Sequence, residues 1–154
     1  LNGGLQAAYF MMAVRAVGID LVGVESFGEQ LGSVGSAFAE RTFTAGELRA
    51  ASGHSGAAQH LAGRFAAKEA FVKAFSGARP GRAPVIPTMD WRQVEVVLDG
   101  WGRPGLVLHG ELAEAVRSTL GEVVLHLSIT HEPTMAAAVV VLEEAQPIRE
   151  TARR

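Results

Sequence analysis

The chain has 154 residues, of which 48% are hydrophobic and 19% are charged, a composition typical of one globular domain. Its formal net charge of −2 gives no basic field for nucleic acid. The absence of cysteine excludes disulfides, thiolate metal sites and a cysteine nucleophile, and it fits a cytoplasmic protein.

Residues 12–145 are expected to form the single domain. Residues 1–11 lack an initiator Met and resemble an expression-tag remnant, so Met12 is the expected native start. Their few apolar residues fit neither a signal peptide nor a membrane span. Residues 146–154 lose apolar periodicity and are expected to form a flexible tail.

Apolar periodicity and capping signals divide the domain into elements. Thr44 and Glu47 form a capping box that predicts a helix ending near Gly53, and Ser55 is the expected N-cap of a long helix that stops after Phe75. The other expected elements are a buried strand at 13–24, a short helix at 26–31, a loop at 78–89, strands at 93–98, 106–108, 123–129 and 135–142, and a helix at 111–120. This order predicts an α+β domain in which an antiparallel sheet packs against helices, one of them long.

Asp20 is a lone carboxylate inside the apolar run of the first strand. A carboxylate buried alone costs several kcal/mol, so it must be paired, hydrogen-bonded or metal-bound. Two readings stay open for Asp20: a hydrogen-bonded structural residue at a strand end, or a metal ligand.

The long helix carries Glu69 among three cations, Arg64, Lys68 and Lys73. At 100° per residue, Phe65, Glu69 and Lys73 share one face, while Arg64 and Lys68 lie toward a neighbouring face. A solvated Glu69–Lys73 ion pair is one reading. The other reading joins Glu69 to Asp20 as the ligands of one divalent cation that also binds a polyphosphate, and oxygen ligands alone favour Mg²⁺.

His131 ends a predicted strand at a turn. It is either a surface or core-edge residue, or a functional residue that contacts a phosphate or nucleotide or relays a proton. His126 should face away from it by strict alternation. His54, His60 and His109 have no carboxylate or histidine at ligand spacing in the sequence and are taken as structural.

With these segments in place, the chain resembles the holo-acyl-carrier-protein synthases, the short 4′-phosphopantetheinyl transferases. The resemblance covers most of residues 17–143 and rests on segments in the family order: 18–20 (GID), 41–47 (RTFTAGE), 61–74 (LAGRFAAKEAFVKA), 102–104 (GRP) and 128–131 (SITH). The lysine- and glutamate-bearing helix is the most specific of them.

The resemblance implies transfer of 4′-phosphopantetheine from coenzyme A to a serine of apo acyl carrier protein, with release of adenosine 3′,5′-bisphosphate. It implies that Asp20 and Glu69 hold Mg²⁺, that Lys73 contacts the phosphates, and that Arg64 and Lys68 shape the same pocket. It also implies that His131 lies beside the nucleotide. Asp20, Glu69 and Lys73 are then the catalytic residues, with Glu69 or a water that it orients as the base.

Short members of this family work as homotrimers with each active site between adjacent subunits, which is the expectation for this chain. The segment after the first strand departs from the family, because Glu25 and Glu29 stand there without a cation. Like charges would weaken binding of an acidic free carrier protein. A carrier domain of a fatty-acid or polyketide synthase is therefore a second candidate partner beside a free carrier protein. The loop bearing Arg79 and Arg82 is a further candidate for phosphate contacts.

Two rival readings remain. In one, the same pocket is a non-catalytic module that binds a nucleotide or a carrier protein. In the other, the chain is a structural oligomer whose charges are solvated.

Overall fold

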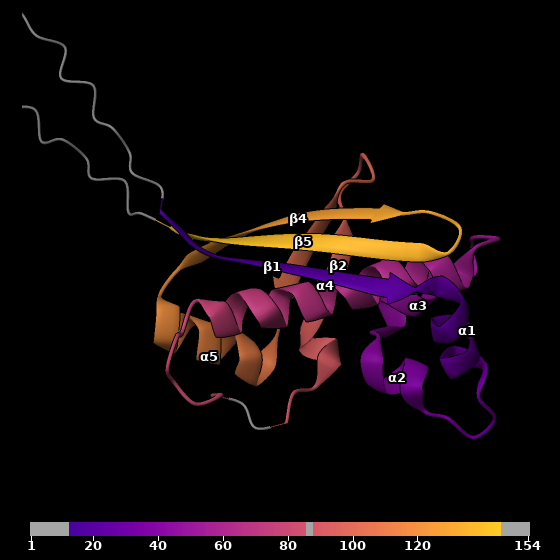
Figure 1. The fold of residues 1–154 in the computed structure, drawn as a ribbon, viewed down its shortest axis with the longest axis horizontal. Helices are drawn as coiled ribbons and strands as arrows, with labels where there is room; N and C mark the ends of the chain where they lie inside the picture. The colour runs from indigo at the N-terminus through magenta and orange to yellow at the C-terminus, as the bar shows by residue number, and fades with distance from the viewer. Residues whose placement is uncertain (1–12, 86–87, 146–154) are drawn as a thin grey trace, which may run out of the picture.

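The computed structural model describes residues 13–85 and 88–145, so the expectations for residues 1–11 and 146–154 lie outside the described residues. The elements, in chain order, are β1 (Val14–Gly23), α1 (Val24–Gly32), α2 (Phe38–Thr42), α3 (Ala45–Ser52), α4 (Ala57–Gly77), η1 (Trp91–Gln93), β2 (Val94–Leu98), β3 (Pro104–Leu108), α5 (Gly110–Leu120), β4 (Val123–His131) and β5 (Met135–Glu144). The α+β architecture is confirmed (Figure 1).

The main sheet is antiparallel and has the strand order β1-β5-β4. Alternation of side chains gives it two unlike faces. Ala138, Val140 and Leu142 of β5 are buried against α4, which runs beneath the sheet (Figure 1). The opposite face is more exposed, so the core lies between one face of the main sheet, α4, β2 and α5.

Gly18 lets β1 and α4 come into close contact. A Cβ atom built at Gly18 would lie 1.9 Å from the Ala70 carbonyl oxygen, a distance that no side chain tolerates. Ala66, Ala70 and Ala74 on α4 are fully buried and keep the helix surface flat. The glycine that precedes Asp20 by two residues therefore brings Asp20 beside α4.

A buried ion pair between Glu47 and Lys68 joins α3 and β2 to α4. The two charged groups lie 2.8 Å apart, and both side chains are fully buried. Lys68 Nζ also donates to the carbonyl oxygens of Trp91 and Val94, while Glu47 accepts from the backbone N–H of Thr44 and Val96. Removing two charged groups from water is costly unless their polar atoms have hydrogen-bond partners. The contacts of Glu47 and Lys68 supply these partners.

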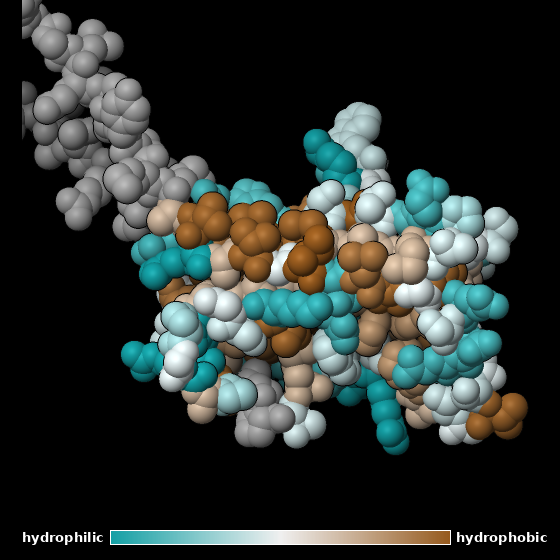
Figure 2. Space-filling view, in the orientation of Figure 1, coloured by the Kyte–Doolittle hydropathy of each residue, from teal (hydrophilic) through white to brown (hydrophobic). Residues whose placement is uncertain are grey.

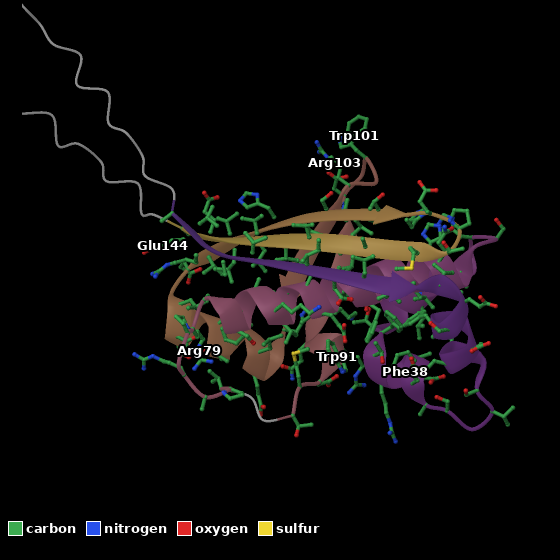
Figure 3. All side chains as sticks on the ribbon, in the orientation of Figure 1. Phe38, Arg79, Trp91, Trp101, Arg103 and Glu144 are labelled. Atoms are coloured by element: carbon green, nitrogen blue, oxygen red, sulfur yellow. The ribbon has the colours of Figure 1, made fainter. Side chains whose placement is uncertain are left out.

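Hairpin β2–β3 forms a second sheet that contacts β4 and α4, and its tip extends above the main sheet in the view of Figure 1. Its turn is held by Asp99, whose carboxylate accepts hydrogen bonds from the backbone of Trp101 and Arg103 and from the Arg103 side chain. Trp101 is 86% exposed at the tip (Figure 3).

Three local expectations need correction. Gly56, not Ser55, is the N-cap of α4, and no side chain caps that helix. The five-residue helix α2 was not expected, because it is too short for periodicity to reveal. The strands form two sheets instead of one. The Thr44–Glu47 capping box is confirmed, with both of its hydrogen bonds present.

No helix in the described part of the chain is long and apolar enough to cross a membrane.

The Glu47–Lys68 pair gives a stability prediction. Lys68→Met leaves the Glu47 carboxylate buried without its cation, and we expect it to lower the free energy of unfolding by about 3–5 kcal/mol. Urea denaturation measures this. Arg117→Met, which breaks the exposed Arg117–Glu114 pair, is the control and should change stability by no more than about 1 kcal/mol. An equal decrease in the free energy of unfolding in the two variants would contradict the stabilising role of the buried Glu47–Lys68 pair.

Candidate active site

Asp20 and Lys73 form the centre of the site. Asp20 lies on the face of β1 that meets α4 and is only 7% exposed. Lys73 Nζ lies 2.6 Å from Asp20 Oδ1 and 3.2 Å from the carbonyl oxygen of Ile19. The other carboxylate oxygen, Asp20 Oδ2, is buried and has no hydrogen-bond partner among the described residues.

Glu69 lies one helical turn before Lys73 and completes this group. Burial raises the pKa of Glu69, and the charge of the nearby Asp20 carboxylate raises it further. Lys73 acts in the opposite direction but does not cancel these effects. The hydrogen bond to Asp20 is the main cause that raises the pKa of Lys73. Two carboxylates and one ammonium thus face one another across the β1–α4 contact.

This group fits a divalent cation. Asp20 Oδ2 is an orphaned buried acceptor, and the repulsion between Asp20 and Glu69 is relieved when a cation lies between them. A donor set of carboxylate oxygens without sulfur or imidazole suits Mg²⁺. Within residues 13–85 and 88–145 no three His, Asp or Glu side chains form a metal site, so two protein ligands would leave positions for water and phosphate oxygens.

The two alternatives left open by the sequence are resolved in part. Lys73 pairs with Asp20 on the neighbouring strand, so it is more than a solvated partner of Glu69 within the helix. Asp20 is hydrogen-bonded through one oxygen, as a structural residue would be, but its second oxygen is free to bind a ligand.

Lys68 does not share this position, which corrects the expectation that it shapes the Glu69 pocket. Its ammonium group contacts Glu47 and two backbone carbonyls in the core. Burial lowers the pKa of Lys68, and Glu47 opposes that change. The local sequence shows two lysines five residues apart and cannot reveal which of them faces α3.

Arg64 is also buried, at 6% exposure, and it donates to the His60 carbonyl oxygen. Its Nε atom has no partner in the described part of the chain. Burial lowers the pKa of Arg64, which the charge of Glu47 partly offsets. The role of Arg64 in shaping the pocket for coenzyme A stays a prediction.

His131 lies in a histidine cluster that the sequence did not reveal. The His54 and His60 rings stack with centroids 4.0 Å apart, and the His60 and His131 centroids are 5.7 Å apart. His54 and His60 are therefore not isolated residues. The sequence indicated only part of this cluster. His54 and His60 lie close together near the start of the long helix, whereas His131 lies about seventy residues further along the chain. His126 faces the other side of the sheet as expected and pairs with Glu143.

Strand β5 separates His131 from Asp20. Asp20 on β1 and Ile129 on β4 both pair with Ala138 of β5, and His131 pairs with Ala136. Two strand spacings of about 4.8 Å place β1 and β4 about 10 Å apart. The Asp20 group and the His131 group therefore lie at opposite edges of the main sheet, and each is called a half-site.

Two surface hollows include candidate binding residues. One, of about 500 Å³, is lined by Phe38, Arg41 and Trp91. The rings of Phe38 and Trp91, both labelled in Figure 3, pack on Phe65, one helical turn before Glu69. The other, of about 510 Å³, includes Arg79 and Arg82 of the loop after α4.

Comparisons with known proteins agree on one family. The model of the 4′-phosphopantetheinyl transferase superfamily matches residues 16–137. The holo-[acyl-carrier-protein] synthase of Mycolicibacterium smegmatis is 50% identical over 134 residues, which are 86% of this chain and 99% of the relative. The Mycobacterium tuberculosis (strain ATCC 25177 / H37Ra) synthase is 51% identical over 133 residues, 86% of this chain and 98% of the relative.

Solved structures agree as well. The Chronobacterium ammoniagenes synthase without ligand superimposes with a TM-score of 0.81 at 43% identity, covering 88% of this chain and 99% of that one. Its complex with coenzyme A gives a TM-score of 0.79 at 44% identity, with 85% and 98% covered. The paired carboxylates, the long helix and these matches show that the chain belongs to the 4′-phosphopantetheinyl transferase superfamily, among its holo-acyl-carrier-protein synthases.

Proposed function

We propose that the chain transfers 4′-phosphopantetheine from coenzyme A to a serine of an apo acyl carrier protein and releases adenosine 3′,5′-bisphosphate. The buried Asp20, which has one oxygen without a partner and which lies beside Glu69 and Lys73, is the observation that carries this proposal. A binding module would gain little from this costly arrangement, whereas attack at a phosphorus atom requires charge to be stabilised there.

Asp20 and Glu69 are the residues that would hold Mg²⁺. When bound, the ion would neutralise charge on the pyrophosphate oxygens. Lys73 reaches the same point from α4, and its exposed ammonium group is placed to contact the phosphates as negative charge builds. The carrier serine oxygen forms a bond to the β-phosphorus, and the bond from that phosphorus to the bridging oxygen breaks. Glu69, directly or through a water that it orients, takes the hydroxyl proton.

Intact-mass spectrometry tests the reaction. Apo carrier protein incubated with the chain, coenzyme A and Mg²⁺ should gain one phosphopantetheine group, and EDTA should prevent the gain. We expect Asp20→Ala and Glu69→Ala each to lower the rate by more than about 100-fold. Circular dichroism should show both variants folded, and Glu114→Ala, at an exposed site on α5, should stay active.

Retained activity in Asp20→Ala or Glu69→Ala would remove the metal assignment. If a synthase-embedded carrier domain gains the mass of phosphopantetheine and a free carrier protein does not, the preference for the carrier would be assigned to the acidic helix α1, which bears Glu25 and Glu29. No gain on either carrier would favour the non-catalytic binding module.

The raised pKa of Glu69 gives a thermal prediction. Because its pKa is higher in the folded protein than in the unfolded chain, ionised Glu69 destabilises the metal-free fold, and stability falls as pH rises from 4.5 through the folded-state pKa. At neutral pH, Glu69→Gln should raise the metal-free Tm by roughly a few degrees.

Differential scanning calorimetry with and without Mg²⁺ checks this prediction. Wild type should gain Tm on addition of Mg²⁺, and Glu69→Gln should not. Glu114→Gln should behave as wild type does. A lower metal-free Tm in Glu69→Gln would contradict repulsion between Glu69 and Asp20.

The proposal includes a homotrimer with each site between two copies. The exposed face of the main sheet supports it, because Val17, Ile19 and Leu21 of β1 are each more than half exposed and form a row of hydrophobic side chains (Figure 2). Such a contiguous row is rare on a monomer. The separation of Asp20 from His131 by β5 also supports it, since the β1 edge of one copy could meet the β4 edge of the next around a closed ring.

Val17→Glu tests the assembly, because it places a charge in this row away from Asp20. Light scattering after size exclusion should report three copies for wild type and one for Val17→Glu, with transfer lost and circular dichroism unchanged. Val34→Glu is the control, since Val34 is fully exposed in the loop after α1. A Val17→Glu monomer with full activity would contradict a shared site.

Mg²⁺ dependence, the carrier protein as partner and a cytoplasmic location are parts of this proposal. Coenzyme A is named in the solved complexes of relatives from Chronobacterium ammoniagenes and Helicobacter pylori. The histidine of the second half-site, His131, is the proposed contact for its nucleotide.

A further inference from the structure

Three arginines meet at the hollow beside the end of α4, which we call the arginine hollow. Arg15 comes from β1, and Arg79 (Figure 3) and Arg82 come from the segment after α4. The register of β1 against β5 shifts between Val14 and Ala16, so Arg15 occupies a bulge, a feature that re-aims a side chain. Cations from two separate segments thus surround one hollow of about 510 Å³.

A Pro-Gly turn fixes two of these arginines side by side. Arg79 and Arg82 are its first and last residues, and the Arg82 N–H donates to the Arg79 carbonyl oxygen at 3.2 Å. Pro80 and Gly81 take the central positions, and Gly81 has a φ of 71°, which a type II turn requires there. The end residues of such a turn have α-carbons within about 7 Å of each other. The turn therefore presents the two arginines together.

Contacts within the chain also order the Arg79 side chain. Its Nη2 atom donates to the Ala83 carbonyl oxygen at 3.1 Å, and its guanidinium group lies 5.5 Å from the centre of the Phe75 ring. A guanidinium group has five N–H donors, so these contacts leave donors of Arg79 for a ligand. A side chain that is ordered in advance loses less entropy when a ligand binds.

The positive charge of the arginine hollow is largely uncompensated. Among the described residues, no carboxylate lines the hollow. Arg15 forms an ion pair with Glu144 at 3.1 Å. Within residues 13–85 and 88–145, Arg79 and Arg82 form no ion pair. Because two of the three guanidinium groups lack a counter-ion in this part of the chain, the ligand that suits the hollow is an anion.

The distance from the reacting group indicates which anion this is. Guanidinium groups pair with both carboxylates and phosphates. Arg15 precedes Asp20 by five residues, about 17 Å along an extended strand. Arg79 follows Lys73 by six residues, about 9 Å at the rise of a helix. The hollow therefore lies beyond contact with a phosphorus atom held at Asp20.

A carrier protein reaches further than the phosphate does. For transfer, the carrier serine must lie at the Asp20 group. A protein interface of standard size covers about 800 Å² on each partner, which is a patch with a radius of about 16 Å. The turn that bears Arg79 and Arg82 lies within this radius of Asp20, and Arg15 lies near its rim. A carrier protein bound for transfer therefore covers the arginine hollow.

We propose that the arginine hollow is a docking site for the carrier protein, which binds there through carboxylates on its surface. The inference rests on the proposed function, in which the carrier protein is the second substrate. The exposed Glu25 and Glu29 of α1 follow the opposite end of β1, so this surface is basic at one end and acidic at the other. The carrier protein docks with its acidic face over the arginine hollow and away from α1.

Charge reversal in the turn tests the docking site. Arg79→Glu/Arg82→Glu should raise the KM for an apo carrier protein of negative net charge by about tenfold or more, because repulsion replaces attraction. The kcat and the KM for coenzyme A should stay unchanged. Arg49→Glu/Arg117→Glu makes the same change in net charge at exposed positions of α3 and α5, and this matched control should behave as wild type does.

A neutral variant keeps the test valid if charge reversal disturbs the fold. Arg79→Gln/Arg82→Gln should be folded by circular dichroism and should raise the KM for the carrier protein by a smaller factor. Isothermal titration calorimetry of the apo carrier protein without coenzyme A should give the same order of affinities, with wild type tightest. Equal affinities of wild type and both turn variants overturn the docking site.

Salt and a competing polyanion identify the interaction as electrostatic. The wild-type kcat/KM for the carrier protein should fall as ionic strength rises from about 0.01 M to about 0.15 M, because the Debye length shrinks from about 30 Å to about 8 Å. Arg79→Glu/Arg82→Glu should show a smaller decrease. Poly-L-glutamate, with Mg²⁺ in excess, should compete with the carrier protein on wild type. Equal inhibition of the charge-reversal variant by poly-L-glutamate overturns the docking site.

The transfer assay separates this inference from the proposed function. If wild type transfers phosphopantetheine and charge reversal leaves the KM for the carrier protein unchanged, the docking site is overturned and the transferase stands. If charge reversal raises only the KM for coenzyme A, the arginines bind the nucleotide and the docking site is overturned. Absence of transfer by wild type overturns the proposed function, and calorimetry with the carrier protein still decides the docking site.

Discussion

The close contact between β1 and α4 at Gly18 is the constraint on which the site depends. Because no side chain separates the strand from the Ala70 backbone, Asp20 lies directly opposite Glu69 and Lys73. This contact buries Asp20 in a place where one of its oxygens has no protein partner. The fold thus accepts an electrostatic cost at one point, as functional sites commonly do.

The remaining buried charges show the opposite arrangement. Glu47 and Lys68 satisfy each other and four backbone groups, so they fix how α3 and β2 meet the helix. Lys68 and Glu69 are adjacent in the sequence but point to different sides of α4, one into the core and the other toward Asp20. The helix α4 therefore both holds the core together through Lys68 and positions the Glu69 carboxylate at the site.

Much of the fold and of the first half-site could be predicted from sequence. A lone carboxylate in an apolar strand, and a glutamate one turn from a lysine on an alanine-rich helix, are local signals, and the capping box fixed the start of α3. The role of Lys68 could not be predicted, because α4 is buried on several sides and both lysines fit its pattern. The histidine cluster escaped because His60 and His131 meet only after β4 folds onto α4.

The central claim is that Asp20 of one copy works with His131 of another. Co-refolding Asp20→Ala with His131→Ala, each inactive alone, tests it most directly by carrier-protein transfer. If the two variants assemble at random, about one quarter of the interfaces contain both a native Asp20 and a native His131. Roughly one quarter of wild-type activity should therefore return. A mixture no more active than its separate components would contradict a site shared between copies.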